Sequence, residues 1–166
     1  MNLTITEYTS NHQAAIRSIL EGIGWAEQYI VAAEKNAEAF SQIPDFFGVY
    51  LAMIEQTAIG FVYVQFYEWN RLAQLQGLAV DVRYQRQGIA SQLVKRAEQF
   101  AQEKQARGIY VDTPTLNHKG RAFYEGIGYQ FGYIMPRYYE DALDGVTYQK
   151  FFDGNATQPL QAEDKR

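Results

Sequence analysis

Apolar residues follow two different periods along the chain, and the change between them marks the elements that the sequence predicts. Residues 47–54 and 58–66 are rich in β-branched and aromatic side chains, with three residues between them, which predicts a β-hairpin. From residue 89 onward the apolar positions recur every three or four residues, as in an amphipathic helix. Its expected buried stripe consists of Ile89, Leu93, Val94, Ala97, Phe100 and Ala101.

The first 45 residues predict one strand and two helices. Leu3 and Ile5 alternate with polar residues as in a half-buried strand. Ser10 and Gln13 have the spacing of a capping box, in which the serine caps the helix and the glutamine reaches back to its start. A second helical stretch is expected over residues 25–40.

The rest of the chain predicts an α+β or α/β domain around a mixed, mostly antiparallel sheet. A strand is expected over residues 72–82, where Gly77 indicates a bulge or a close approach of another group. Gly108 is placed to end the amphipathic helix. Further strands are expected over residues 109–112, 129–134 and 146–152, with a polar and aromatic loop over residues 135–145.

The composition favours a single globular domain. The chain has 166 residues, of which 47% are hydrophobic and 20% charged, and this length suits one domain with a sizeable core. We expect that domain over residues 1–152 and a frayed polar tail over residues 153–166. A net charge of −4, without a long Lys/Arg cluster, argues against a nucleic-acid partner.

Cysteine chemistry, a metal site and a membrane are not expected. The chain has no cysteine, which excludes disulfides and thiol catalysis. His12 and His118 lie far apart without carboxylates at ligand spacing. The first ten residues lack the apolar core of a signal peptide, and no apolar run reaches transmembrane length. A cytoplasmic location is therefore the expectation.

The segment before the amphipathic helix is the strongest candidate for chemistry. It runs from the apolar residues 78–80 through a polar turn to Gly88, where the helix starts. Amide groups at a helix start have no intrahelical partner and lie at the positive end of the helix dipole, so such an end binds phosphate. Gly88 and Ala90 have little or no side chain, so a pyrophosphate can approach the main chain. The alternative is an ordinary strand-to-helix turn.

Two motifs about thirty residues apart resemble those of one family. Residues 85–90 fit the signature (Gln/Arg)-x-x-Gly-x-(Gly/Ala), and a later motif places Asn117, Tyr124, Glu125, Gly128 and Tyr129 in register. On these residues the chain resembles the GNAT superfamily of acyl-CoA-dependent N-acetyltransferases, over roughly residues 46–152. Gly120 stands where the family usually has alanine. The resemblance implies a sheet of about six to seven strands flanked by about four helices, and acetyl-CoA as the cofactor.

The resemblance also implies roles for individual residues. The pantetheine arm would bond to the main chain of Leu78 and Val80, and the amide of Val80 would be the oxyanion donor. Asn117 would bond the same arm, or cap the short helix. Tyr124 would be the general acid, because a phenol of ordinary pKa near 10 keeps its proton at neutral pH; its alternative role is an aromatic anchor. The expected cofactor-binding residues are Leu78, Val80, Gln85, Arg86, Gln87, Gly88, Ile89, Ala90, Ser91, Asn117 and Tyr124.

No residue stands out as the general base. Many family members have a glutamate on the strand before the turn, but residues 72–80 contain no carboxylate. Glu68 lies just before that strand, Asp81 is better explained as a turn-capping or ion-paired aspartate, and His118 is expected to be exposed. We expect a chain of waters, or an amine that arrives neutral, in place of a protein base.

An acceptor pocket is expected where aromatic faces meet carboxylates. In the resembling fold it is walled by the first two helices and by the loop between the last two strands. Such walls suit a cationic amine through cation–π contacts and charge pairing, while the alternative for the loop carboxylates is plain solvation. The expected substrate-binding residues are Trp25, Tyr29, Trp69, Tyr138, Glu140 and Asp141.

Together these features predict an N-acetyltransferase that moves an acetyl group from acetyl-CoA to a primary amine, by direct transfer in a ternary complex. A small cationic amine is the preferred acceptor. Two alternatives stay open: a protein N-terminus or lysine as the acceptor, and a non-catalytic domain that binds or senses acyl-CoA. A homodimer is left open as well.

Overall fold

The computed structural model describes residues 2–154 and divides into two compact units. Unit 1 runs to Ala106, and unit 2 begins at Arg107. The described residues contain seven strands and four α-helices in the predicted order β-α-α-β-β-β-α-β-α-β-β. The predicted fold class, an α/β domain with mostly antiparallel strands, is confirmed. The predicted tail lies outside the described residues from residue 155 on.

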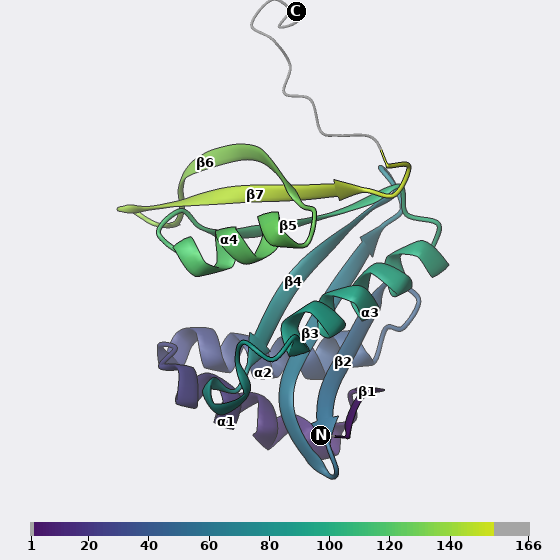
Figure 1. Ribbon diagram of the computed structural model, residues 1–166, viewed down its shortest axis with the longest axis vertical. Coiled ribbons are helices and arrows are strands. Elements are labelled where there is room, and N and C mark those ends of the chain that lie inside the picture. The colour runs from purple at the N-terminus through teal and green to yellow at the C-terminus, as the bar shows by residue number, and fades with distance from the viewer. Residues whose placement is uncertain (1, 155–166) are drawn as a thin grey trace, which may run out of the picture. The chain divides into compact units, whose positions relative to one another are not determined.

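Unit 1 is an antiparallel sheet with helices on both faces (Figure 1). Two helices cover one face and the third covers the other, so both faces of the sheet are shielded from water. The strands, in spatial order, are β1 Leu3–Glu7, β2 Phe47–Ile54, β3 Thr57–Tyr67 and β4 Leu72–Val80. The helices are α1 Gln13–Ile23 and α2 Glu27–Ser41 on one face, and α3 Ile89–Glu103 on the other.

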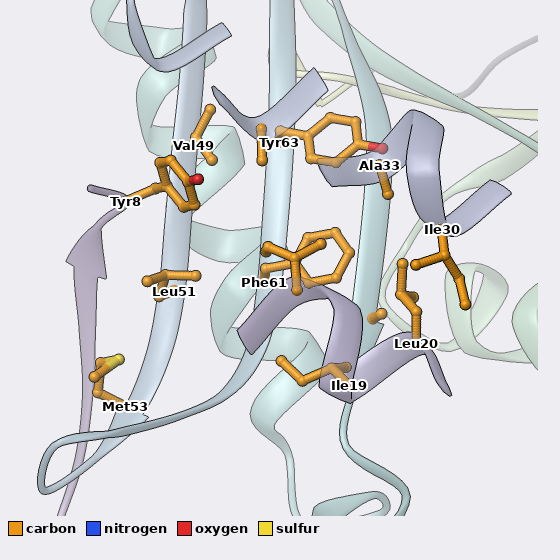
Figure 2. Packing of buried hydrophobic residues seen from close by; sticks show 13 residues of the cluster. Tyr8, Ile19, Leu20, Ile30, Ala33, Val49, Leu51, Met53, Phe61 and Tyr63 are labelled. Atoms are coloured by element: carbon orange, nitrogen blue, oxygen red, sulfur yellow. The ribbon is translucent and has the colours of Figure 1, made fainter. Parts of the chain in front are cut away.

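The core between the α1–α2 pair and the sheet follows from alternation along the strands. Val49, Leu51 and Met53 of β2 lie on the same side as Phe61 and Tyr63 of β3 (Figure 2). Successive strand residues point to opposite faces, so this burial fixes the register of each strand. Each large apolar side chain buried there stabilises the fold by about 1.5–3 kcal/mol.

Helix α3 buries the predicted stripe of six apolar residues against the opposite face. Gly60 of β3 shows how close the helix lies, because a Cβ atom placed on it would be 3.2 Å from Leu93 Cδ1 and 3.4 Å from Val80 Cγ2. Val80 therefore faces α3, while its neighbour Ala79 faces the α1–α2 side. This places the last residue of β4 directly beneath the start of the helix that follows it.

Unit 2 is a three-stranded antiparallel sheet with one helix. Strand β7 Leu143–Phe151 pairs with β5 Gly108–Pro114 on one side and with β6 Gln130–Glu140 on the other. Helix α4 His118–Gly126 connects β5 to β6. Tyr148 of the central strand is completely buried.

The loop predicted over residues 135–145 is wrong, because most of it is strand. Strand β6 continues to Glu140 and β7 already begins at Leu143. The pairing jumps from Met135 opposite Gly145 to Glu140 opposite Leu143, so the strand carries an irregular stretch. Main-chain hydrogen bonds can pair two strands whose side chains do not alternate between apolar and polar. Such an alternation is the feature from which a strand is predicted, so the extended β6 was predicted as a loop.

Two helix boundaries predicted from single residues are also wrong. Ser10 does not cap α1, because its hydroxyl donates to Glu38 Oε1 at 2.7 Å and the helix begins three residues later without a side-chain cap. Gly108 does not end α3, which stops at Glu103, and Gln105 takes the left-handed conformation with φ of +60°. Gly108 instead opens β5.

Within the described residues, none of the helices is both long and apolar enough to cross a membrane.

Candidate active site

The end of β4 directs main-chain groups away from β3. Val80 lies opposite Gly60, and the Asp81 amide donates to the Ile59 carbonyl at 2.8 Å. These two observations make Val80 and Gly60 a non-hydrogen-bonded pair, in which the N–H and C=O groups of both residues point away from the partner strand. Leu78, two residues earlier on the strand, has the same orientation. The main-chain groups of Leu78 and Val80 therefore have the direction that the sequence analysis requires of them.

A compact turn follows β4, and its first residue is structural. Asp81 Oδ1 accepts from the Arg83 amide at 2.9 Å, and Asp81 Oδ2 pairs with the Arg83 guanidinium at 2.7 Å. The bond from Arg83 lowers the pKa of the Asp81 carboxyl below its ordinary value. Gln85 Nε2 donates to the Val80 carbonyl at 3.0 Å. Asp81 thus has the capping and ion-pairing role that the sequence favoured over a general base.

Main-chain amides gather where the turn becomes a helix. Arg86 and Gly88 take left-handed conformations, with φ of +61° and +79°. The first hydrogen bond of α3 runs from the Gln92 amide to the Gly88 carbonyl at 3.2 Å, so the amides of residues 89–91 lie ahead of it. Gly88 supplies no side-chain cap, and nothing lies within 4 Å of a Cβ atom placed on it. These open amides, at the positive end of a helix of 15 residues, fit a phosphate group.

The side chains of this segment differ in exposure. Gln85, Arg86, Gln87 and Ser91 are exposed, Ala90 is half-buried, and Ile89 is buried beneath the turn. Ile89 therefore anchors the helix start in the core, and a ligand there would meet its amide rather than its side chain.

A bulge lies in the middle of β4, as Gly77 predicted. Tyr63 of β3 is opposite Gly77, while the next residue, Val64, is opposite Leu75. Gln76 is therefore an extra residue in β4, and extra residues of this kind bend and twist a strand. The bulge lies directly before the segment that carries Leu78 and Val80.

In unit 2, Asn117 caps helix α4. Its Oδ1 accepts from the Gly120 amide at 3.1 Å, and its Nδ2 donates to Thr113 Oγ1 at 2.9 Å. A Cβ atom on Gly120 would lie 2.4 Å from Asn117 Nδ2, so this side-chain conformation requires glycine where the family usually has alanine. The capping role is thus present, and cofactor binding by Asn117 stays a prediction.

Tyr124 of α4 is 7% exposed and is surrounded by other rings. Its ring centroid lies 5.2 Å from Phe123, 5.7 Å from Tyr129 and 6.4 Å from Tyr148. Burial raises the pKa of the Tyr124 hydroxyl above its ordinary value, so the group keeps its proton. Its hydroxyl makes no hydrogen bond within the part of the chain that the structure describes. The anchoring role is visible, and the catalytic role stays a prediction.

A hydrogen-bond chain fixes the helix that carries Tyr124. Arg121 Nε donates to the Tyr148 hydroxyl at 3.1 Å, and that hydroxyl donates to Glu125 Oε1 at 2.8 Å. Arg121 also donates to the Thr115 carbonyl at 3.0 Å. These bonds join α4 to the centre of β7 and hold the rings around Tyr124 in place.

The structure brings together only some of the predicted acceptor residues. Trp25 and Tyr29 are 40% and 38% exposed and lie at the α1–α2 connection. Trp69, 85% exposed, lies in the β3–β4 turn and borders a shallow hollow of about 660 Å³ together with Ile43. Ile43 follows the far end of α2, a helix about 22 Å long at 1.5 Å per residue. Trp69 is therefore not beside Tyr29.

A charge cluster beside the α1–α2 connection was not found from the sequence. Arg17 of α1 pairs with Glu21 at 3.3 Å, Glu27 at 3.0 Å and Glu34 at 2.7 Å. The bond from Arg17 lowers the pKa of Glu27 below its ordinary value, so that carboxylate stays charged. Three carboxylates against one guanidinium leave this region negatively charged.

The predicted acceptor residues of unit 2 lie near the β6–β7 turn, and two of them already contact neighbouring side chains. Tyr138 and Glu140 are exposed, and the Tyr138 hydroxyl donates to Asp112 Oδ2 at 3.4 Å. Asp141 pairs with the Arg137 guanidinium at 2.6 Å. The charge of Asp141 is therefore already paired with Arg137 of β6.

The structure distinguishes the candidates for a general base by their positions in the fold. Glu68 lies before the start of β4 and Val80 at its end, and the strand between them is about 27 Å long at 3.4 Å per residue. His118 is exposed at the start of α4. Asp112, a half-buried carboxylate of β5 that accepts from Thr147 and Tyr138, was missed. The feature that could have indicated it is a charged residue at the end of the apolar strand predicted over residues 109–112.

A sequence model of the acetyltransferase (GNAT) family matches residues 16–129. The chain belongs to this family. The matched region runs from α1 to the residue before β6, so it includes the β4 end, the turn and α4. The family predicted from the two motifs is confirmed, and the enzyme class that it implies is that of an acetyltransferase.

Individual relatives of this GNAT chain are similar over different lengths. A candidate ribosomal protein bS18 alanine N-acetyltransferase of Bacillus subtilis (strain 168) is 30% identical over 69 residues, which is 42% of the chain and 46% of that protein. The chain thus matches about half the length of this curated relative. The crystal structure of a candidate streptothricin acetyltransferase from Bacillus anthracis strain Ames, in complex with acetyl coenzyme A, is 27% identical with a TM-score of 0.60. That match covers 65% of this chain and 64% of the other.

A third relative extends the similarity in fold over nearly the whole chain. An aminoglycoside 6′-N-acetyltransferase complexed with coenzyme A has a TM-score of 0.78 at 17% identity, and the match covers 95% of this chain and 99% of the other. The predicted GNAT-like fold is confirmed. The predicted cofactor agrees with the acetyl-CoA and CoA that these two solved structures contain.

Proposed function

We propose that the chain transfers an acetyl group from acetyl-CoA to a primary amine, by direct transfer in a ternary complex. The observation that carries this proposal is the turn at residues 85–91, where open main-chain amides lie at the start of α3. A side-chain site for phosphate would need arginines or lysines, whereas this turn offers donors that no side chain covers. Membership of an acetyltransferase family supports the same function.

The proposed donor site uses main chain more than side chains. The amides at the start of α3 would hold the pyrophosphate. The outward groups of Leu78, together with the Val80 carbonyl that already accepts from Gln85, would bond the amide-rich pantetheine arm and leave the Val80 amide for the thioester. The exposed side chains of Gln85, Arg86 and Gln87 would lie beside the phosphates. Asn117 is proposed as a further contact to the arm, although both ends of its amide are engaged within α4 and β5.

The proposed chemistry needs two groups of the protein. Bound acetyl-CoA supplies an acetyl group activated as a thioester. The Val80 amide donates to the carbonyl oxygen as negative charge develops there during attack by the neutral amine. The Tyr124 hydroxyl gives its proton to the departing sulfur, and its raised pKa keeps that proton in place at neutral pH. Water takes the proton that the amine loses and returns a proton to the Tyr124 oxygen, which leaves an acetylated amine and CoA as products and restores the hydroxyl.

A small cationic amine is the proposed acceptor. Trp25 and Tyr29 expose aromatic faces beside a cluster with three carboxylates and one guanidinium, which suits a positively charged ligand. The relatives do not decide between a small-molecule acceptor and a protein acceptor, since one is named for an aminoglycoside and another for the alanine of a ribosomal protein. A protein N-terminus or lysine is therefore the rival acceptor.

The deciding experiment is a thiol-release assay with acetyl-CoA and a panel of polyamines, amino sugars, aminoglycosides and short peptides. The chain contains no cysteine, so a thiol reagent reports CoA without background from the protein. Release that depends on a small cationic amine supports the proposal, and release with peptides alone moves the function to the rival. Tight acetyl-CoA binding without release by any acceptor would leave only the non-catalytic alternative.

The assembly and location belong to the same proposal. We place the catalytic domain over residues 1–152, acting in the cytoplasm as a monomer or a homodimer. The family model covers residues on both sides of the boundary between the two units, which supports one functional domain. Light scattering after gel filtration gives the oligomeric state, and fractionation of cells that express the tagged chain gives the location.

A further inference from the structure

One glycine of β4 is covered by an aromatic ring. A Cβ atom placed on Gly77 would lie 2.2 Å from Tyr63 Cζ, 2.5 Å from Cε1 and 2.7 Å from Cε2. These distances are far below any real contact, so the ring lies directly over the α-carbon and only hydrogen fits there. Gly77 and Tyr63 are also directly opposite one another in the β3–β4 pairing.

The Tyr63 ring is buried and contacts two other aromatic rings and a side chain of α2. Tyr63 is 5% exposed, lies 5.8 Å from the Phe61 ring and has the Phe40 ring edge-on at 5.6 Å. Its hydroxyl bonds the side chain of Asn36 on α2. Figure 2 shows the ring reaching sideways from β3 with its hydroxyl toward α2. Tyr63 therefore connects a fixed helix to one point on β4.

That point lies between the bulge and the outward-pointing residues. The extra residue Gln76 comes directly before Gly77, and Leu78 directly after it. A strand can shift its register at a bulge, and a shift by one residue turns every following side chain to the other face and reverses its main-chain groups. The covered glycine fixes where the bulge ends, and so fixes the direction of the Leu78 and Val80 groups.

We propose that Tyr63 is a positioning residue for acetyl transfer: by covering Gly77 it fixes the β4 main chain that directs Val80 at the thioester. This inference rests on the proposed function. The turn at residues 85–90, which would hold the pyrophosphate, lies beyond the clamped segment and is joined to it by the bond from Gln85 to the Val80 carbonyl. Loss of the ring should therefore impair the chemical step most, and it should weaken acetyl-CoA binding to a smaller extent, because Leu78 and Val80 are also proposed to bond the pantetheine arm.

The test compares Tyr63→Leu with a matched control, Tyr50→Leu. Tyr50 covers Gly48 of its own strand, β2, with a Cβ atom there 2.7 Å from Tyr50 Cε2, and is 4% exposed, so its ring does not hold β4 through that glycine. Both variants remove a buried ring from above a glycine. Tyr63→Leu should lower kcat at least about tenfold, since small misplacements at a reacting centre have large effects on rate, and the rise in KM for acetyl-CoA should be smaller than this fall in kcat. Tyr50→Leu should leave kcat of the folded protein unchanged.

Three further measurements separate positioning from a general loss of stability. Tyr63→Phe keeps the ring over Gly77 and should retain most of kcat. Gly77→Ala should lower kcat in the native background but have little further effect together with Tyr63→Leu, because the methyl group then has room. Hydrogen exchange should become faster at residues 75–80 in Tyr63→Leu and not in Tyr50→Leu.

Wild-type kcat and unchanged exchange in Tyr63→Leu would overturn the inference, as would an equal loss of kcat in Tyr50→Leu. If Tyr63→Leu does not fold, Asn36→Ala removes only the anchor of the hydroxyl and should give a smaller fall in kcat, with a still smaller change in KM for acetyl-CoA. The proposed function fails separately, if the unaltered protein releases no thiol with any amine; in that case the role in catalysis falls with it, and the exchange rates alone decide whether the clamp exists.

Discussion

Replacing Gly88 by alanine gives the sharpest test of the donor site. Nothing lies within 4 Å of a Cβ atom at this position, so the only cost to the fold comes from the left-handed backbone with φ of +79°. That cost is about 1–2 kcal/mol for an alanine, which lowers Tm by about 2–4 °C per kcal/mol in a protein of this size. We expect the added methyl group to take part of the open space at the helix start in which the pyrophosphate is proposed to bind.

The expected loss of affinity follows from the bonds that the methyl group would block. A hydrogen bond from an amide to a charged group contributes about 1.5–3 kcal/mol, so loss of one such bond should raise Kd for acetyl-CoA about 10- to 150-fold. Calorimetric titration of acetyl-CoA measures this directly. Acetyl-pantetheine lacks the pyrophosphate, so its KM should not respond to Gly88→Ala.

Gly24→Ala is the matched control for this experiment. Gly24 at the end of α1 also takes a left-handed conformation, with φ of +94°, and a methyl group placed on it would also have nothing within 4 Å. It should show a similar fall in Tm and an unchanged Kd for acetyl-CoA. Equal affinities in the two variants, whether both normal or both weakened, would refute the assignment of the pyrophosphate to the turn.

Three further variants test other parts of the site. Tyr124→Phe keeps the ring contacts and breaks no described hydrogen bond, so Tm should hold while single-turnover rates fall at least about tenfold; unchanged rates would reduce Tyr124 to an anchor. Because burial raises its pKa, activity should also show no loss from Tyr124 ionisation as pH rises toward 10. Glu140→Gln with Asp141→Asn should raise KM for a cationic amine only about two- to fivefold, because exposed charge pairs contribute at most about 1 kcal/mol; a change confined to KM for acetyl-CoA would argue against an acceptor role. Asn117→Ala removes the cap of α4 and should destabilise the protein by about 1 kcal/mol in thermal unfolding, whatever its effect on CoA.

Local features could be predicted from the sequence wherever the residues that cause them lie within one helix, strand or turn. The stripe of α3 and the start of that helix at Ile89 followed from a period of three to four residues and a glycine. The bulge near Gly77 followed from one glycine within a strand. In each case the residues that form the feature are neighbours in the sequence, so the pattern contains the whole cause.

Features that depend on distant partners were missed. Ser10 has the sequence context of a helix cap, but Glu38, 28 residues later, takes its hydroxyl instead. Trp69 was grouped with Tyr29 because both are aromatic, although the length of α2 separates them. Nothing in the sequence pairs Tyr63 with Gly77, since only the register of β3 against β4 brings them together. The family motifs supplied candidate residues at the site, but not the contacts that hold these residues in place.

The proposed donor site is made of main-chain amides, whereas the proposed acceptor site is made of side chains, and this difference has a consequence for inhibitors. The proposed pyrophosphate donors at the start of α3 are main-chain groups, so, if they act as proposed, a compound that mimics the pyrophosphate would bind them whatever side chains surround Gly88. Such a compound should therefore tolerate most single substitutions of the turn's side chains. Selectivity would have to come from groups that contact Trp25 and Tyr29, which are exposed side chains that can differ from one enzyme to the next.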